Sequence, residues 1–193
     1  MELEVNKNKT VIFAVLIIIL IATPVSGQEM MPQELKKRVL SAWEKYIYWP
    51  SPENAREIAN TIPEKWIGIT IDLSEIFYDE DFKILEINMF SGEKEAIGVI
   101  YKMKNISDAA QHEMLNYELG YLIRINPRVF LRELVRNRRY VADIAEIIMN
   151  YGSFAPDNRA ADYERRARIK ALESVNEKEF SEIKEECLNV LRK

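Results

Sequence analysis

The residue types that most often carry catalysis are scarce in this chain of 193 residues, which has one cysteine, Cys187, and one histidine, His112. A single cysteine excludes an intramolecular disulfide and any multi-cysteine zinc or iron–sulfur site, and a single histidine argues against a histidine-rich metal site. The sequence contains no G-x-S-x-G, H-E-x-x-H, P-loop or G-x-G-x-x-G motif. We therefore expect no metal and no cofactor, and the balance is against an enzyme.

The remaining chemical candidates each have a plainer structural interpretation. His112 lies one position off the apolar face of a predicted helix, which favours a structural residue over a general base. Asp79-Glu80-Asp81 would suit calcium, but Ile84 stands where an EF-hand loop needs glycine, and acidic residues also suit a helix start. Paired carboxylates, as in glycosidases, stay possible without any specific pair being indicated. Cys187 is expected to be buried, with pairing to another chain as the alternative.

All three tryptophans lie within 24 residues, at positions 43, 49 and 66, and two tyrosines accompany them. The cluster is expected to fill the core beneath the first helices. The alternative is that Trp49 and Trp66 are exposed and grip a protein partner or stack on a sugar. These two tryptophans are therefore candidate binding residues.

The net charge of −4 hides an uneven distribution along the chain. Residues 51–120 hold 6 basic and 14 acidic side chains, whereas residues 120–170 hold 11 basic and 6 acidic. In the basic segment three arginines recur every four residues, which places them along one helix face, and a fourth ends the preceding predicted helix. These four candidate binding residues are Arg124, Arg128, Arg132 and Arg136.

An outward-facing arginine row would attract the carboxylate or phosphate groups of a partner. The alternative is that the basic helices pack against the acidic half of the same chain. Asp162–Arg166 and Glu164–Arg168 are spaced as ordinary i, i+4 pairs, each worth roughly a few tenths of a kcal/mol. Because the whole chain is acidic, nucleic acid is not an expected partner.

The N-terminal residues 1–27 have the three parts of a secretory signal peptide. Lys7 and Lys9 precede an apolar run of 12 residues, Val11 to Ala22, and small residues follow. This run is shorter than the roughly 20 residues that span a bilayer. We predict cleavage between Gly27 and Gln28, a secreted or periplasmic mature chain, and no membrane span after cleavage. An uncleaved N-terminal anchor is the alternative.

Hydrophobic spacing and capping signals predict about eight short helices in a single domain at 28–193. Pro50 ends the first helix, and Ser51-Pro52 and Asn126-Pro127 are typical of helix starts. The expected helices are 33–48, 52–62, one that Ser107 or Asp108 caps and that reaches 125, one from 127, 140–149, one from 157 or 158 to about 175, and one that Asn176 caps.

Residues 66–103 are ambiguous. The isoleucines at 67, 69 and 71 alternate with small or polar residues, which indicates a strand, and a hairpin over 83–103 is conceivable. Ala96, Ile97, Ile100 and Met103 also fit one helix face. The fold class favoured is an all-α bundle or short α-solenoid, with an α+β fold as the alternative.

The segment GYLIRINPRVFLREL at 120–134 forms a helix–Asn-Pro–helix joint. It resembles joints in uncharacterised exported bacterial proteins with HEAT-like helical arrays. The resemblance implies a fold of stacked helices and transfers no activity or site residue.

These observations together favour an exported, non-enzymatic helical module that binds another protein. One alternative is a periplasmic inhibitor or immunity-type protein, with Arg128, Arg132 and Arg136 as the blocking face. Another is a glycan-acting hydrolase, which would place two carboxylates about 5–10 Å apart beside an exposed Trp49 or Trp66.

Overall fold

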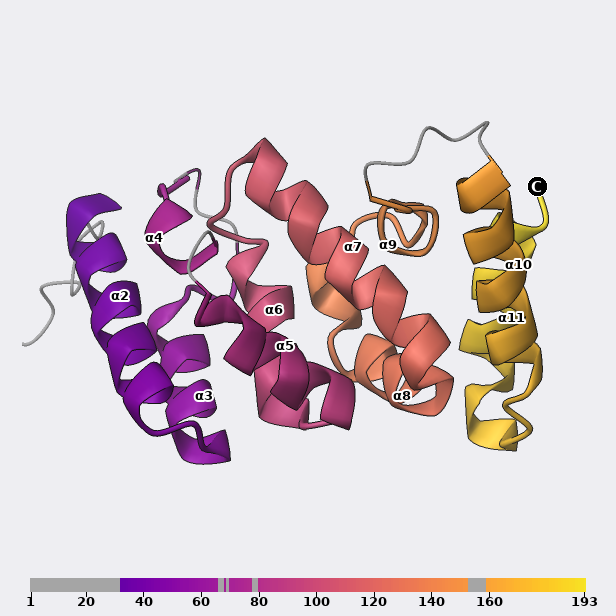
Figure 1. The fold of residues 1–193 in the computed structure, drawn as a ribbon, viewed down its shortest axis with the longest axis horizontal. Helices are drawn as coiled ribbons and strands as arrows, with labels where there is room; N and C mark the ends of the chain where they lie inside the picture. The colour runs from indigo at the N-terminus through magenta and orange to yellow at the C-terminus, as the bar shows by residue number, and fades with distance from the viewer. Residues whose placement is uncertain (1–31, 66–67, 69, 78–79, 153–158) are drawn as a thin grey trace, which may run out of the picture. The chain divides into compact units, whose positions relative to one another are not determined.

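A computed structural model describes residues 32–65, 68, 70–77, 80–152 and 159–193 (Figure 1). These residues form ten α-helices and two short 3-10 helices, and no strand occurs among them. The all-α prediction is confirmed, and the α+β alternative is wrong for the described part of the chain. The predicted signal peptide at 1–27 and its cleavage point lie outside it. No helix in the described ranges has both the length and the apolar character needed to span a membrane.

The first two helices are α2 (Pro32–Tyr48) and α3 (Pro52–Thr61). Between them Ser51 caps α3: its Oγ accepts a hydrogen bond from Asn54 N at 3.3 Å. Pro52 occupies the first turn, where its missing N–H costs nothing. The start of α3 therefore follows from two adjacent residues.

The ambiguous segment contains α4 (Ser74–Phe77), α5 (Phe82–Ser91) and α6 (Lys94–Met103). Ile71 and Leu73 precede them outside any helix or strand and are both buried. Ile71 N donates to Ile106 O at 2.8 Å, a single backbone bond that no neighbouring ladder extends in the described residues. The alternation of exposed and buried residues over 70–73 therefore belongs to a connection that crosses the helical core.

The chain continues through α7 (Ala109–Ile125) and α8 (Pro127–Arg136). Asp108 and Gln111 form a capping box at the start of α7. Asn126 Oδ1 accepts from Val129 N at 3.3 Å and so caps α8. The predicted helix–Asn-Pro–helix joint is confirmed as a local structure.

The predicted helix at 140–149 is too long. The structure has a 3-10 helix, η1 (Arg138–Tyr140), and a single-turn helix, α9 (Ala145–Ile148). Between them Asp143 Oδ1 accepts from Ala145 N at 2.8 Å, an Asx turn that competes with helix continuation.

The last helices are α10 (Arg159–Glu173) and α11 (Ser181–Leu191), with the 3-10 helix η2 (Lys178–Phe180) just before α11. Asn176 does not cap α11, because its side-chain nitrogen donates to Ser174 O at 3.3 Å instead. Cys187 on α11 is fully buried and free, which confirms the expected burial.

The helices pack in a series that runs from α2 to α11 (Figure 1). α2 packs on α3, α3 on α6, and α6 on α5, α7 and α8; α7 then contacts α8, α9 and α10, and α11 contacts α8, α9 and α10. The buried side chains are therefore shared between neighbours along this series, among them Leu35, Tyr46, Ile58, Leu85, Ile97, Leu119, Phe130, Ile147, Leu172 and Leu188.

Candidate functional site

A polar cavity of about 460 Å³ lies where the end of α3, the α6–α7 connection and η1 meet. Most of its lining side chains are charged or can form hydrogen bonds. The lining residues are Glu64, Lys65, Lys104, Asn105, Ser107, His112, Arg139, Tyr140, Val141 and Ala142. Segments far apart in the chain thus supply one concentrated polar site.

The carboxylate of Glu64 is already neutralised on one wall of this cavity. It pairs with Lys102 and accepts a hydrogen bond from the hydroxyl of Tyr140. Arg139 Nη2 lies 2.9 Å from its Oε2. The hydrogen bonds from Lys102 and Tyr140 are the main reason that the pKa of Glu64 falls below its ordinary value.

Lys104 stands out because its ammonium has no hydrogen-bond partner among the residues that the structure describes. The residue is only 6% exposed, and its Nζ meets no hydrogen-bond acceptor in the described part of the chain. Burial lowers the pKa of Lys104 to about 8, and the charge of Glu146 opposes that shift. Ser107 Oγ, also on the cavity wall, is likewise buried without a hydrogen-bond partner within the described ranges.

His112 lines the same cavity from α7. Its Nε2 lies 3.6 Å from Glu146 Oε2. Burial, and then the nearby charge of Lys104, lower the pKa of His112 below its ordinary value. The ring is therefore neutral at pH 7. The fold brings it close to Lys104, a neighbour that the sequence around His112 did not indicate.

The aromatic cluster divides between core and surface. Trp43 and Tyr46 are buried, as expected for core residues, and Asn88 Nδ2 donates to Tyr46 Oη at 2.6 Å. Tyr48 and Trp49, in contrast, are 88% and 69% exposed. Trp66, the other predicted binding tryptophan, lies outside the described residues.

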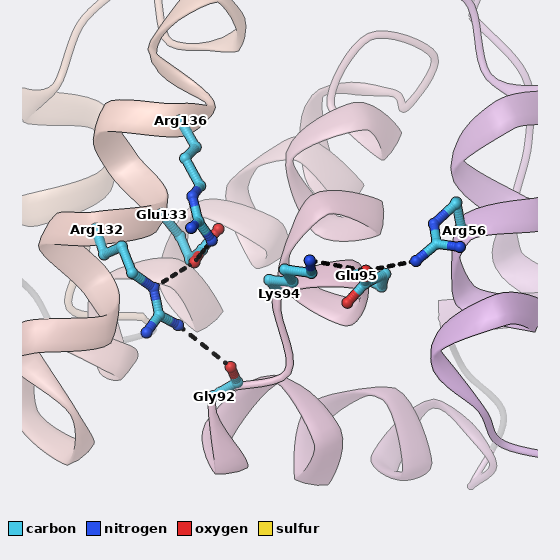
Figure 2. Close-up of polar contacts among 7 residues, drawn as sticks. All are labelled: Arg56, Gly92, Lys94, Glu95, Arg132, Glu133 and Arg136. Carbon is cyan, nitrogen blue, oxygen red and sulfur yellow. Dashed lines mark hydrogen bonds and ion pairs between the residues drawn. The ribbon is translucent and has the colours of Figure 1, made fainter.

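Two of the predicted arginines share one acidic partner on their own helix, α8 (Figure 2). Arg132 Nε and Arg136 Nη1 lie 2.7 and 2.8 Å from the same Oε1 of Glu133, which is 2% exposed. Arg132 Nη2 also reaches Gly92 O at 3.5 Å, at the end of α5. These two guanidiniums compensate a buried carboxylate within the chain.

The other two arginines pair with acidic residues near the C-terminus. Arg124 Nη1 lies 2.9 Å from Glu164 Oε2 and sits over the rings of Tyr121 and Tyr163. Arg128 Nε lies 2.8 Å from Glu177 Oε1, and its side chain is largely exposed. The row therefore contacts Glu133 on α8, Gly92 at the end of α5, and Glu164 and Glu177 in the C-terminal part of the chain. Arg139–Glu64 is one bridge from the basic to the acidic segment.

Trp49 and the arginine row do not form one site. Trp49 follows α2, whereas the arginines lie on α7 and α8, and α3 and α6 pack in succession between α2 and α8 (Figure 1). Within this intervening layer, Glu95 of α6 pairs with Arg56 of α3 and with Lys94 (Figure 2).

The Glu164–Arg168 pair is not the surface pair that its spacing suggested. Arg168 is fully buried, and its Nε lies 3.2 Å from Glu164 Oε1. Its Nη1 donates to the carbonyls of Ile147 and Ile148 at the end of α9, and its guanidinium lies over the ring of Tyr151. Asp162 pairs with Arg165. Arg168 thus joins α9 to α10 in the core.

Comparisons with protein families, with curated proteins and with solved structures found no match to this chain. The geometry of its own residues is therefore the basis for any function.

Proposed function

We propose that the mature chain is an exported, non-enzymatic protein that binds another protein through the corner of residues 48–51, between α2 and α3. The observation that carries the proposal is the exposure of two consecutive aromatic residues, Tyr48 and Trp49. Tryptophan and tyrosine dominate the binding energy of many protein interfaces because they bury a large apolar area with few rotatable bonds. An isolated exposed aromatic would need no explanation, but two consecutive exposed aromatic residues at a helix end support a role as an anchor.

The backbone of this corner is held in place. Trp49 N donates to Lys45 O at 3.0 Å, and Asn54 Nδ2 donates to Trp49 O at 2.8 Å. Lys45 also pairs with Glu57 of α3 across the corner. A fixed backbone lowers the entropy lost on binding, which supports a role for these rings in recognition.

The two alternatives have less support. An inhibitor that blocks an enzyme with the arginine row would have to break ion pairs that Arg132 and Arg136 already make with Glu133. A hydrolase needs two carboxylates open to a polysaccharide. Glu118 is a carboxyl whose pKa burial, and then the charge of Glu86, raise to about 7, but Glu118 is buried and so is not open to a polysaccharide.

Binding is tested with a photo-crosslinking residue at position 49, in the cells that produce the protein. A matched variant carries the crosslinker at Tyr163, another exposed aromatic position. The protein captured at position 49 is then purified and titrated with wild type, Trp49→Ala and Tyr163→Ala. We expect Trp49→Ala to bind at least tenfold more weakly and Tyr163→Ala to bind as wild type does. Equal affinity of the wild type and Trp49→Ala would refute the corner as the binding surface.

Export and the absence of catalysis need their own measurement. Mass spectrometry of the protein recovered outside the cytoplasm should show Gln28 as its first residue. A chain that starts at Met1 and stays with the membrane would support the N-terminal anchor instead. Turnover of a substrate by purified protein, abolished by one point substitution in a cavity, would contradict the non-enzymatic proposal.

A further inference from the structure

We propose that the polar cavity between α3, α7 and η1 binds a small oxyanion, a carboxylate or a phosphate group, through the ammonium of Lys104 and the hydroxyl of Ser107. This site is separate from the corner at residues 48–51 and does not depend on protein binding there.

The first step of the argument is the unsatisfied ammonium. Burying a charged group without a hydrogen-bond acceptor is costly, so buried lysines almost always have a partner. Lys104 is buried and its Nζ has none in the described ranges. Ser107 Oγ is in the same condition on the same cavity wall. One oxyanion could accept hydrogen bonds from both groups and complete the site.

The second step is the balance of charge around Lys104. Glu64 is the one carboxylate among the lining residues, and Lys102, Arg139 and Tyr140 already hold it. Glu146 of α9 raises the pKa of Lys104 through space, and its Oε2 lies 3.6 Å from Nε2 of His112. Lys104 shares the cavity with Glu64 and Lys65 after α3, His112 on α7, and Arg139 and Tyr140 on η1, and Glu146 on α9 acts on its charge. With His112 neutral, the charges of these neighbours cancel, so the charge of Lys104 is left in excess in the cavity.

The third step is size. A cavity of about 460 Å³ falls in the range of pockets that hold metabolite-sized ligands, roughly 300–1,000 Å³. Lysine binds phosphate and carboxylate groups as a point charge, so both sources of the oxyanion are tested.

The test measures binding of inorganic phosphate and of succinate to the purified protein by calorimetry, at constant ionic strength with chloride as the reference anion. Lys104→Met keeps the apolar stem and removes the charge. Lys94→Met makes the same change of net charge at an exposed position. We expect at least one of the two anions to bind wild type and Lys94→Met alike, and to bind Lys104→Met at least tenfold more weakly.

A second variant and a second observable keep the result interpretable. Ser107→Ala should weaken binding several-fold without altering charge. The single histidine, His112, gives its own NMR signals, and Lys104 is one of the causes that lower its pKa. Lys104→Met, and binding of the anion to wild type, should each raise the pKa of His112 towards its ordinary value. Binding should weaken as the pH rises through about 8, where Lys104 loses its proton.

Each outcome has one meaning. Binding of phosphate alone, or of succinate alone, assigns the site to that class of anion. Failure of both anions to bind wild type overturns the proposal. So does binding that Lys104→Met and Ser107→Ala leave unchanged.

Discussion

The guanidinium of Arg168 occupies the space that a side chain at Gly120 would need. A Cβ at Gly120 would lie 2.5 Å from the backbone oxygen of Ile147, and closer still to Nη1 of Arg168. Gly120 is in the middle of α7, Ile147 belongs to α9, and Arg168 belongs to α10. The absence of one side chain thus lets three helices meet around a buried charge.

We predict that Gly120→Ala destabilises the protein by about 1–3 kcal/mol, because the new methyl group displaces both the backbone of α9 and the guanidinium. The free energy of unfolding in urea, followed by circular dichroism, measures this change. Gly98→Ala in α6 is the matched control, since a Cβ there would have no neighbour within 4 Å. That substitution should stabilise the protein by roughly 0.5–1 kcal/mol through helix propensity. Equal effects of the two substitutions would contradict the close packing at Gly120.

The sequence predicts best where a few adjacent residues determine the local structure. Ser51-Pro52, Asp108 and Asn126-Pro127 each start a helix by satisfying backbone N–H groups within the next turn. The helix predicted at 140–149 is wrong in length because apolar spacing records burial and not backbone conformation. Val141, Ile144 and Ile148 are all buried, although only the last is helical.

The polar cavity could not be predicted in this way. Glu64 and Tyr140 are 76 residues apart, and only the packing of η1 against the end of α3 brings them together. One signal was present: Lys102 and Lys104 occupy positions next to buried apolar residues at the end of α6. A lysine there is either paired or costly to bury, and the sequence alone does not tell the two apart.

The arginines around Glu133 should have non-additive effects. Arg132→Ala or Arg136→Ala alone leaves one guanidinium on the carboxylate, so each should cost about 1 kcal/mol or less. The double substitution leaves a buried carboxylate without its partners and should cost about 3 kcal/mol or more. Adding Glu133→Gln to the double variant should recover much of that loss. Arg128→Ala, at an exposed pair, should change stability by no more than about 0.5 kcal/mol. Strict additivity of the two single effects would contradict the shared partner.

Glu118 on α7 should make stability depend on pH. Burial, and then the charge of Glu86, raise the pKa of Glu118 from 4.5 to about 7. The native state therefore favours the protonated carboxyl. The contribution of Glu118 to the free energy of unfolding is complete below pH 4.5 and is lost as the pH rises to about 7. Glu118→Gln should be more stable than wild type by up to about 3 kcal/mol above pH 7, with little difference at pH 4.

The control for this prediction removes the charge of Glu86, the second cause of the raised pKa of Glu118. Glu86→Gln should lower the pKa of Glu118 and so reduce the advantage that Glu118→Gln confers in the same background. Urea unfolding at pH 4, 6 and 8 measures both effects. A stability difference between wild type and Glu118→Gln that does not change with pH would show that the pKa of Glu118 is the same in the native and unfolded states, and would contradict the prediction.

Cys187 should be unreactive in the folded protein. Its side chain is fully buried on α11, and burial, aided by the charge of Glu186, raises the pKa of its thiol to about 12. Because the thiolate is the reactive form, Ellman's reagent at pH 8 should label the native protein only as fast as it unfolds, and completely in denaturant. The control is Ser181→Cys combined with Cys187→Ala, which places an exposed thiol at the start of the same helix and should react within minutes. Native Cys187 that reacted as fast as this control would reopen the possibility of a disulfide between chains.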